Sequence, residues 1–255
     1  MLNLTWKIVI TCIVFLYGIV IGSFLNVCIF RIPLKEEVVK TRSHCMLCGH
    51  ILKWYELIPL FSWLIQGGKC RACKAKISRQ YPLVEGLNGL LWLLVFFRYK
   101  FSYLTLIYFL MASCLIVIFV LDLRNKKVYL STLLFLSLLG IIRVLLDYKN
   151  ILYYLSGAII VGLLLFIISK INKGRTIDMG TVLLMAICAL LTGRREIIIA
   201  LILGLIISLI ALLIKFGIKK SDDKTFSISA YFTIGIFVAS IWGADLVAGI
   251  NALIH

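Results

Sequence analysis

Two pairs of cysteines in this sequence have the spacing of metal ligands. Cys45 and Cys48 form one C-x2-C pair, Cys70 and Cys73 form a second, and 21 residues separate the pairs. This pattern is typical of two knuckles that present four thiolates to one tetrahedral zinc ion. Because four thiolates leave no open position for a reactive water, the sequence predicts a structural zinc site.

Disulfide bonds are the alternative use of these four cysteines. Zinc is favoured because the charge of the loops, described below, places the region on the reducing cytoplasmic side of a membrane. The remaining cysteines stand singly in apolar runs and are expected to pack as small hydrophobic side chains; they are Cys12, Cys28, Cys114 and Cys188.

Two aspartates at the edges of apolar segments are candidates for catalysis. Asp122 follows the apolar run 119–121, and Asp178 stands just before another apolar run. Carboxylates near hydrocarbon are costly and are therefore functional candidates. Two carboxylates that meet at one membrane surface can share a proton and activate a water between them, which is the chemistry of aspartic proteases.

Helix capping is the alternative role for both aspartates. Asp178 suits an N-cap or first-turn position, where the helix dipole favours negative charge. Asp122 lies beside the cation Arg124, as expected of a residue at a helix end. Glu85, which follows Pro82, is a third acidic candidate, and a structural role in the first turn of a helix suits it equally well.

The elements that carry these residues are predicted to be membrane-spanning helices. The chain has 255 residues, of which 62% are hydrophobic, and its mean hydropathy is +1.08. Such a composition exceeds what a soluble core of this size can bury. The sequence predicts an all-α polytopic membrane protein with about eight transmembrane helices and a small cytoplasmic zinc-binding module. The expected spans are residues 6–30, 83–97, 103–121, 128–146, 151–169, 179–192, 197–214 and 227–241, with a short apolar tail after them.

The second and sixth of these spans are short. Pro33 and Pro59 lie within the polar stretch 31–80 and Pro82 lies just after it, and Pro33 and Pro82 are expected to end the first helix and begin the second. The predicted organisation is a first transmembrane helix over 1–30, a cytoplasmic zinc-knuckle region over 31–81 and a transmembrane core over 82–255.

The distribution of basic residues predicts the orientation in the membrane. Of the 27 Lys and Arg residues, 20 fall in the polar stretch 31–80 and in the loops 122–127, 170–178 and 215–224, which lie on one side if the spans alternate. The positive-inside rule places that side in the cytoplasm and the N-terminus outside. Membrane topology therefore explains the net charge of +16, and no nucleic-acid partner is expected.

Several segments of the N-terminal third resemble the type IV prepilin leader peptidases. The residues Gly22–Pro33, read as GSFLNVCIFRIP, resemble the opening motif of that family. The other matching segments, in order, are SHCMLC at 43–48, WYELIP at 54–59, LFSWL at 60–64, GKCRAC at 68–73 and ISRQYPLVE at 77–85.

This resemblance implies a membrane-embedded aspartic peptidase that removes the short basic leader of prepilins or pseudopilins at the cytoplasmic membrane face. In many members of the family the enzyme also methylates the new N-terminus with S-adenosylmethionine. Compact members of this kind serve competence pseudopili. The implied partners are prepilin-like precursors and membrane lipids.

The C-terminal half departs from the family pattern. The first family aspartate matches Asp122, although Tyr129 stands where many members have proline. The second belongs to a G-x-G-D motif twelve residues before a glycine, and counting back from Gly193 places Thr181 at that aspartate. Because threonine does not ionise near neutral pH, the expected dyad is Asp122 with Asp178, one helical turn before Thr181. The alternative is a catalytically degenerate relative that binds pilin-like helices without cleaving them.

Overall fold

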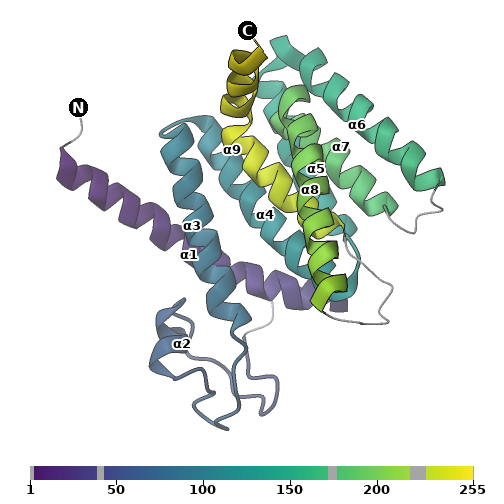
Figure 1. The fold of residues 1–255 in the computed structure, drawn as a ribbon. Coiled ribbons are helices and arrows are strands. Elements are labelled where there is room, and N and C mark those ends of the chain that lie inside the picture. Colours follow the sequence, from purple (N-terminus) through teal and green to yellow (C-terminus); the bar gives the residue numbers. More distant parts are fainter. Residues whose placement is uncertain (1–2, 39–42, 172–176, 219–227, 255) are drawn as a thin grey trace. The chain divides into compact units, whose positions relative to one another are not determined.

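The computed structural model describes residues 3–38, 43–171, 177–218 and 228–254, and outside the region between α1 and α3 they are mostly helical (Figure 1). The long helices are α1 (Leu4–Leu34), α3 (Gln80–Tyr99), α4 (Tyr103–Asn125), α5 (Leu130–Leu146), α6 (Ile151–Ile171), α7 (Met179–Thr192), α8 (Arg194–Ile218) and α9 (Ser229–Ile254). Short helical segments are η1 (Trp54–Glu56), α2 (Phe61–Ile65) and η2 (Tyr148–Asn150). The chain forms two compact units, Met1–Val117 and Ile118–His255, and each is described by itself. The expected division at residues 30 and 81 stays a prediction.

Each of the eight expected spans corresponds to a helix, which confirms an all-α membrane protein. Among the described residues, six helices are long and apolar enough to cross a bilayer, while α5 with 17 residues and α7 with 14 are shorter. The expectation that the second span is short is wrong, because α3 has 20 residues. The predicted apolar tail is also wrong as a separate segment, since α9 continues to Ile254.

The first helix continues past the expected end of its span at residue 30 and includes Pro33. Pro33 lies inside the last turn of α1, and the helix stops at Lys35, whose backbone is left-handed with φ 56°. Proline interrupts a helix by removing a donor and crowding the preceding turn, but close to a C-terminus few further bonds remain to be lost. Pro82 lies in the first turn of α3, where proline is well tolerated, as expected.

In the first unit, α1 and α3 approach each other closely through glycine. A Cβ atom at Gly22 would lie 2.7 Å from the Cα of Glu85, and one at Gly18 would lie 2.7 Å from the Cα of Gly89. Small residues four positions apart allow membrane helices to pack backbone against backbone. The contact is reinforced by Asn88, whose side-chain amide donates a 2.7 Å hydrogen bond to the carbonyl of Gly18.

Substituting Gly22 with alanine is expected to weaken this contact. The added methyl group meets backbone that cannot move aside, and overpacking of this kind costs about 1–3 kcal/mol. Thermal unfolding in detergent should show a lower Tm for Gly22→Ala. Gly249→Ala is the matched control, because nothing lies within 4 Å of a Cβ at that position. Equal Tm values for the two variants would contradict this account of the α1–α3 contact.

In the second unit, the short helix α7 is surrounded by its neighbours. It contacts α5, α6, α8 and α9, and its side chains Leu184, Met185, Cys188 and Ala189 are fully buried. A helix enclosed by other helices has little contact with lipid, so its length need not match the bilayer. The start of α7 is therefore held by protein on several sides, and Asp178 stands at that start.

Candidate functional site

The four predicted zinc ligands come together in the first unit. The sulfur atoms of Cys45, Cys48, Cys70 and Cys73 all lie within 4.8 Å of one another, and the Sγ atoms of Cys45 and Cys73 are 3.8 Å apart. Zinc–thiolate bonds of about 2.3 Å in a tetrahedron place the sulfur atoms about 3.8 Å apart. The cluster therefore has the dimensions of a zinc site with four thiolate ligands.

The backbone of the two pairs follows one repeated pattern. The Cys45 and Cys70 N–H groups donate to the carbonyls of His50 and Ala75, each at 2.9 Å, and each turn is closed by a further 2.9 Å bond to the first cysteine's carbonyl. Isolated antiparallel bridges join residues 44 and 51 in one turn and 69 and 76 in the other. The sequence spacing thus produces two equivalent knuckles that face each other.

Backbone N–H groups in the first knuckle favour a thiolate. The N–H groups of Leu47 and Cys48 lower the pKa of Cys45 to about 6. The His50 N–H acts in the same direction on Cys48, but lost solvation and the neighbouring thiols outweigh it and raise that pKa to about 11. Zinc binds the thiolate form, so a metal ion would remove the protons that the cluster otherwise holds.

One position of the repeat is occupied by different residues in the two knuckles. Gly49 has φ 68° and its counterpart Lys74 has φ 59°, a left-handed conformation that costs a residue with a Cβ about 1 kcal/mol or more. We expect Lys74→Gly to stabilise the knuckle by about 1 kcal/mol and Gly49→Ala to destabilise it similarly, since open space around Gly49 leaves only the backbone effect. Zinc release to a chelator, followed over time, should be slower in the first variant and faster in the second. The same rate of zinc release in wild type and both variants would show that these turns do not limit the release.

A buried glutamate braces the zinc region from the side. Glu56 accepts a 2.9 Å hydrogen bond from the Lys53 N–H, and its carboxylate lies 3.2 Å from His50 Nε2 and 3.8 Å from Arg71 Nε. The Lys53 bond is the main cause of a lowered pKa for Glu56, with His50 and Arg71 adding to it. The Arg71 guanidinium also lies over the Tyr55 ring, 5.0 Å from its centre. These contacts tie the second knuckle to the segment before α2.

Glu85, the third acidic candidate, has a structural partner. Its carboxylate accepts a 2.7 Å hydrogen bond from the backbone N–H of Leu60, the residue immediately before α2. Leu60 is held at φ 62°, an uncommon conformation for a residue with a branched side chain. Glu85 thus fastens α2 to the second turn of α3.

Asp122 lies near the end of α4 and is 2% exposed. Its Oδ2 accepts a 2.7 Å hydrogen bond from the N–H of Ala230, in the first turn of α9. A carboxylate is favoured at this place because the first-turn N–H groups of a helix have no partner within the helix.

Asp178 is the N-cap of α7, as the capping alternative predicted. Its two carboxylate oxygens accept hydrogen bonds from the N–H groups of Gly180 and Thr181, at 3.2 and 3.1 Å. The Thr181 hydroxyl also donates to Asp178 Oδ1. The side chains of residues 178 and 181 are therefore in direct contact at the start of α7.

The start of α9 connects the two aspartates. Thr181 Oγ1 lies 3.0 Å from Ser229 Oγ, and Ser229 is followed directly by Ala230, which donates to Asp122. Because a hydroxyl carries one proton, Ser229 donates to Thr181 when Thr181 donates to Asp178. Hydrogen bonds thus link the end of α4 with the starts of α7 and α9, the same ends that the loop charges placed on one side.

Comparison with known proteins gives matches of two kinds. Residues 16–99 match a family model described as Bacterial Peptidase A24 N-terminal domain. A protein of Bacillus subtilis (strain 168) named prepilin leader peptidase/N-methyltransferase is 31% identical over 182 residues, which cover 71% of this chain and 73% of that protein. The chain belongs to the prepilin leader peptidase family.

Two further relatives carry the same name. The protein of Stutzerimonas stutzeri is 28% identical over 91% of this chain and 90% of its own length. The protein of Myxococcus xanthus (strain DK1622) is 51% identical, but over only 35% of this chain and 27% of its own length. The chain thus matches some prepilin leader peptidases along most of their length and others along about a quarter to a half. No solved structure matches it.

The strong family match coincides with the zinc region and its two flanking helices, α1 and α3. It ends before α4, so Asp122, Asp178 and Thr181 lie outside it. Sequence reasoning did not include Ser229 and Ala230 among the residues near the aspartates. The only signal was a pair of small residues at the start of the last apolar segment, which is too common to point to a site.

Proposed function

We propose that this chain is a membrane-embedded aspartic endopeptidase that removes the leader of type IV prepilin-like or pseudopilin precursors at the cytoplasmic membrane face. Membership of the prepilin leader peptidase family supports the reaction class. The observation that carries the proposal is the hydrogen-bonded link from Asp122 through Ala230 and Ser229 to Thr181 and Asp178. It supports a site at which two carboxyl groups from α4 and α7 act together.

In the proposed reaction, one aspartate takes a proton from a water that attacks the scissile carbonyl. The other aspartate, protonated, donates a hydrogen bond to the oxygen on which negative charge develops. Both carboxylates accept N–H donors at helix starts, Asp122 from Ala230 and Asp178 from Gly180 and Thr181. Either aspartate can therefore serve as the base while the other supplies the acidic proton.

The proposed orientation follows the loop charges, with the N-terminus outside and the zinc region in the cytoplasm. The linked ends of α4, α7 and α9 are the ends that this orientation assigns to the cytoplasm. A leader with basic residues stays on the cytoplasmic side of the membrane, so a site there meets its substrate before the rest of the precursor is transported.

Zinc has a structural role in this proposal. The four thiolates of Cys45, Cys48, Cys70 and Cys73 would hold it and leave no position for water. S-adenosylmethionine is implied by the names of relatives. The 620 Å³ cleft beside the second knuckle is lined by Lys69, Arg71 and Lys74, which disfavour a cationic sulfonium.

The decisive test is to co-express the chain with a prepilin-like precursor encoded beside its gene and to determine the intact mass of the product. Loss of the leader peptide is the expected result, and an additional methyl group would show N-methylation. An unprocessed precursor, with the chain present in the membrane and loaded with zinc, would contradict the proposed peptidase activity.

A second function is favoured by one observation: Asp178 caps its own helix. It agrees with the family resemblance, which implies that Thr181 stands at the place of the second aspartate. In this alternative the chain binds pilin-like helices without cleaving them. Thr181→Asp distinguishes the two functions. A degenerate enzyme that regains cleavage on this single change supports the alternative, whereas an active wild-type chain should lose activity, because a second carboxylate beside Asp178 is repelled by it.

A further inference from the structure

We propose that α2 and the second zinc knuckle form a binding surface for anionic phospholipid at the face of the membrane where α1 ends and α3 begins. The surface is defined as the exposed apolar side chains of Phe61, Leu64 and Ile65 together with the cations Lys69, Arg71 and Lys74. It is independent of the peptidase activity.

The position of α2 is fixed by its bond to α3. Leu60, immediately before α2, donates to Glu85, which lies five residues after the start of α3. At a rise of 1.5 Å per residue, Glu85 is about 7–8 Å along the helix from Gln80. If α3 spans the membrane, this bond draws α2 to the depth of the lipid headgroups.

The apolar side chains of α2 do not pack into the protein. Phe61 is 54% exposed, Leu64 is 65% exposed and Ile65 is 76% exposed. Exposed apolar groups gathered on one short helix are unfavourable in water but suit the boundary between headgroups and acyl chains. The sequence places Trp63 among them, and its indole N–H donates towards the Ile77 carbonyl, which anchors α2 to the segment leading into α3.

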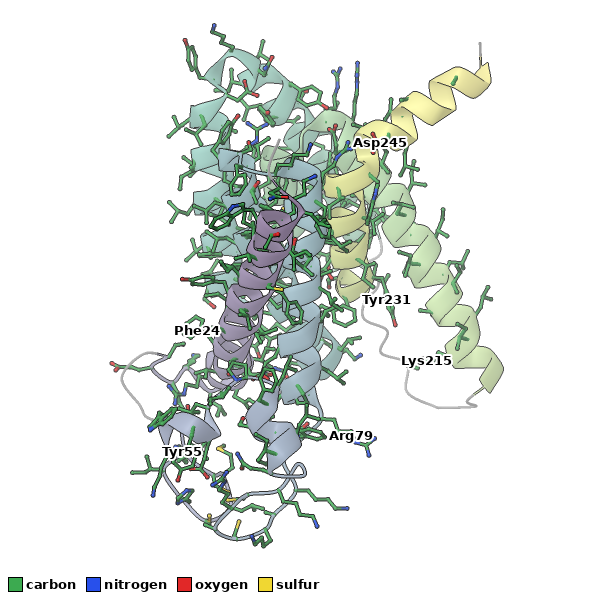
Figure 2. The ribbon with its side chains drawn as sticks, turned by 90° about the vertical axis from the view of Figure 1, so that its left-hand side faces the viewer. Phe24, Tyr55, Arg79, Lys215, Tyr231 and Asp245 are labelled. Atoms are coloured by element: carbon green, nitrogen blue, oxygen red, sulfur yellow. The ribbon has the colours of Figure 1, made fainter. Side chains whose placement is uncertain are left out.

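The cations lie next to these apolar groups in one cleft. The cleft has a volume of about 620 Å³ and is lined by Ile65, Gln66, Lys69, Cys70, Arg71 and Lys74. Lys69 and Lys74, which both belong to the second knuckle, have exposed side chains. An apolar residue beside several cations matches the two parts of an anionic phospholipid, an acyl chain and a phosphate. Figure 2 shows Tyr55 and Arg79 in the same part of the first unit, at one end of α1 and α3.

The test uses the full chain in detergent, titrated with phosphatidylglycerol or phosphatidylcholine and followed by native mass spectrometry. We expect wild type to bind phosphatidylglycerol more tightly. Lys69→Gln/Lys74→Gln should weaken that binding about 25-fold, since each cation near an anionic headgroup contributes about a factor of five. Arg71 is left in place because it contacts Tyr55 and Glu56. Zinc content, measured alongside, should not change.

The control variant is Lys100→Gln/Lys149→Gln, which removes the same amount of charge elsewhere. Lys100 follows the end of α3 that is remote from α2, and Lys149 lies in η2. Equal weakening in both variants would show a non-specific charge effect and overturn the proposal. Full displacement of phosphatidylglycerol by millimolar inorganic phosphate would also overturn it, because a soluble anion would then be the ligand.

The apolar part is tested by hydrogen exchange in nanodiscs. The amides of residues 61–65 should exchange more slowly in the bilayer than in short-chain detergent, and Leu64→Ser/Ile65→Ser should remove most of that difference. If these amides become protected only when a prepilin is added, the surface binds protein and the lipid proposal fails.

Discussion

Asp122→Asn is expected to reduce leader cleavage by a factor of about 10²–10⁴, the range attributed to a positioned general acid or base. Asparagine keeps the shape of the side chain, and its carbonyl oxygen can still accept the hydrogen bond from Ala230. The link between α4 and α9 should therefore survive while the charge is lost. The measurement is the initial rate of leader release from a purified prepilin in proteoliposomes.

Asp178→Asn is the matching variant and should lower the rate by a comparable factor. Asparagine is as good an N-cap as aspartate, so the start of α7 should remain intact. A loss of activity can then be attributed to the ionisable group and not to an unfolded helix end. An undiminished rate for Asp178→Asn would remove it from the proposed dyad.

A third substitution controls for the general effect of losing an acidic residue. Asp245→Asn changes an exposed aspartate in α9, well along the helix from Ser229, and should leave the rate within about a factor of two. If all three variants lose activity equally, the proteins have failed to insert or fold, which thermal unfolding of the same samples would reveal.

Cys70→Ser is expected to release zinc and to unfold the region between α1 and α3. Cys70 is the most enclosed of the four ligands, at 3% exposed, and a hydroxyl is a poor substitute for a thiolate. Structural zinc sites contribute an apparent free energy of about 10 kcal/mol or more, so their loss exceeds what the few other contacts of this region can offset. The measurements are zinc per chain by mass spectrometry and the rate of limited proteolysis within residues 43–79.

The transmembrane helices should remain folded in this variant, because the α1–α3 contact is made by glycines and Asn88 and not by the zinc region. Cys12→Ser, at an exposed position in α1, is the control and should keep both zinc and protease resistance. If Cys70→Ser retains zinc although only three of the four cysteines remain, another group, such as His44 or His50, completes the site.

The clustering of the four cysteines is the part of the protein that sequence reasoning predicted best. A C-x2-C pair fixes two thiolates within one tight turn, so local backbone geometry alone brings them together, and the repeat of the pattern supplies the other two. The helices were also found from their apolar runs. Their ends were less accurate, since Pro33 was taken as a stop although a proline in a last turn costs little.

The arrangement of the acidic residues was not predictable in the same way. Asp178 caps α7 through bonds to residues two and three positions away, which sequence can suggest. The bond from Ala230 to Asp122 joins residues 108 positions apart, and that from Leu60 to Glu85 joins residues 25 apart. No local pattern marks Ala230 or Leu60, because each contributes a backbone N–H that every residue except proline possesses.

By itself, the sequence determined the membrane class, the long helices of the described residues, the four cysteines that cluster and the family. Each of these depends on composition or on spacing within a few turns of chain. Only the tertiary structure decided which helix ends meet, that Glu85 holds α2, and that Ser229 and Ala230 lie between Asp122 and Asp178. The physical reason is that these contacts depend on how helices pack, and helices of similar apolar composition can pack in many ways until their glycines and polar groups select one.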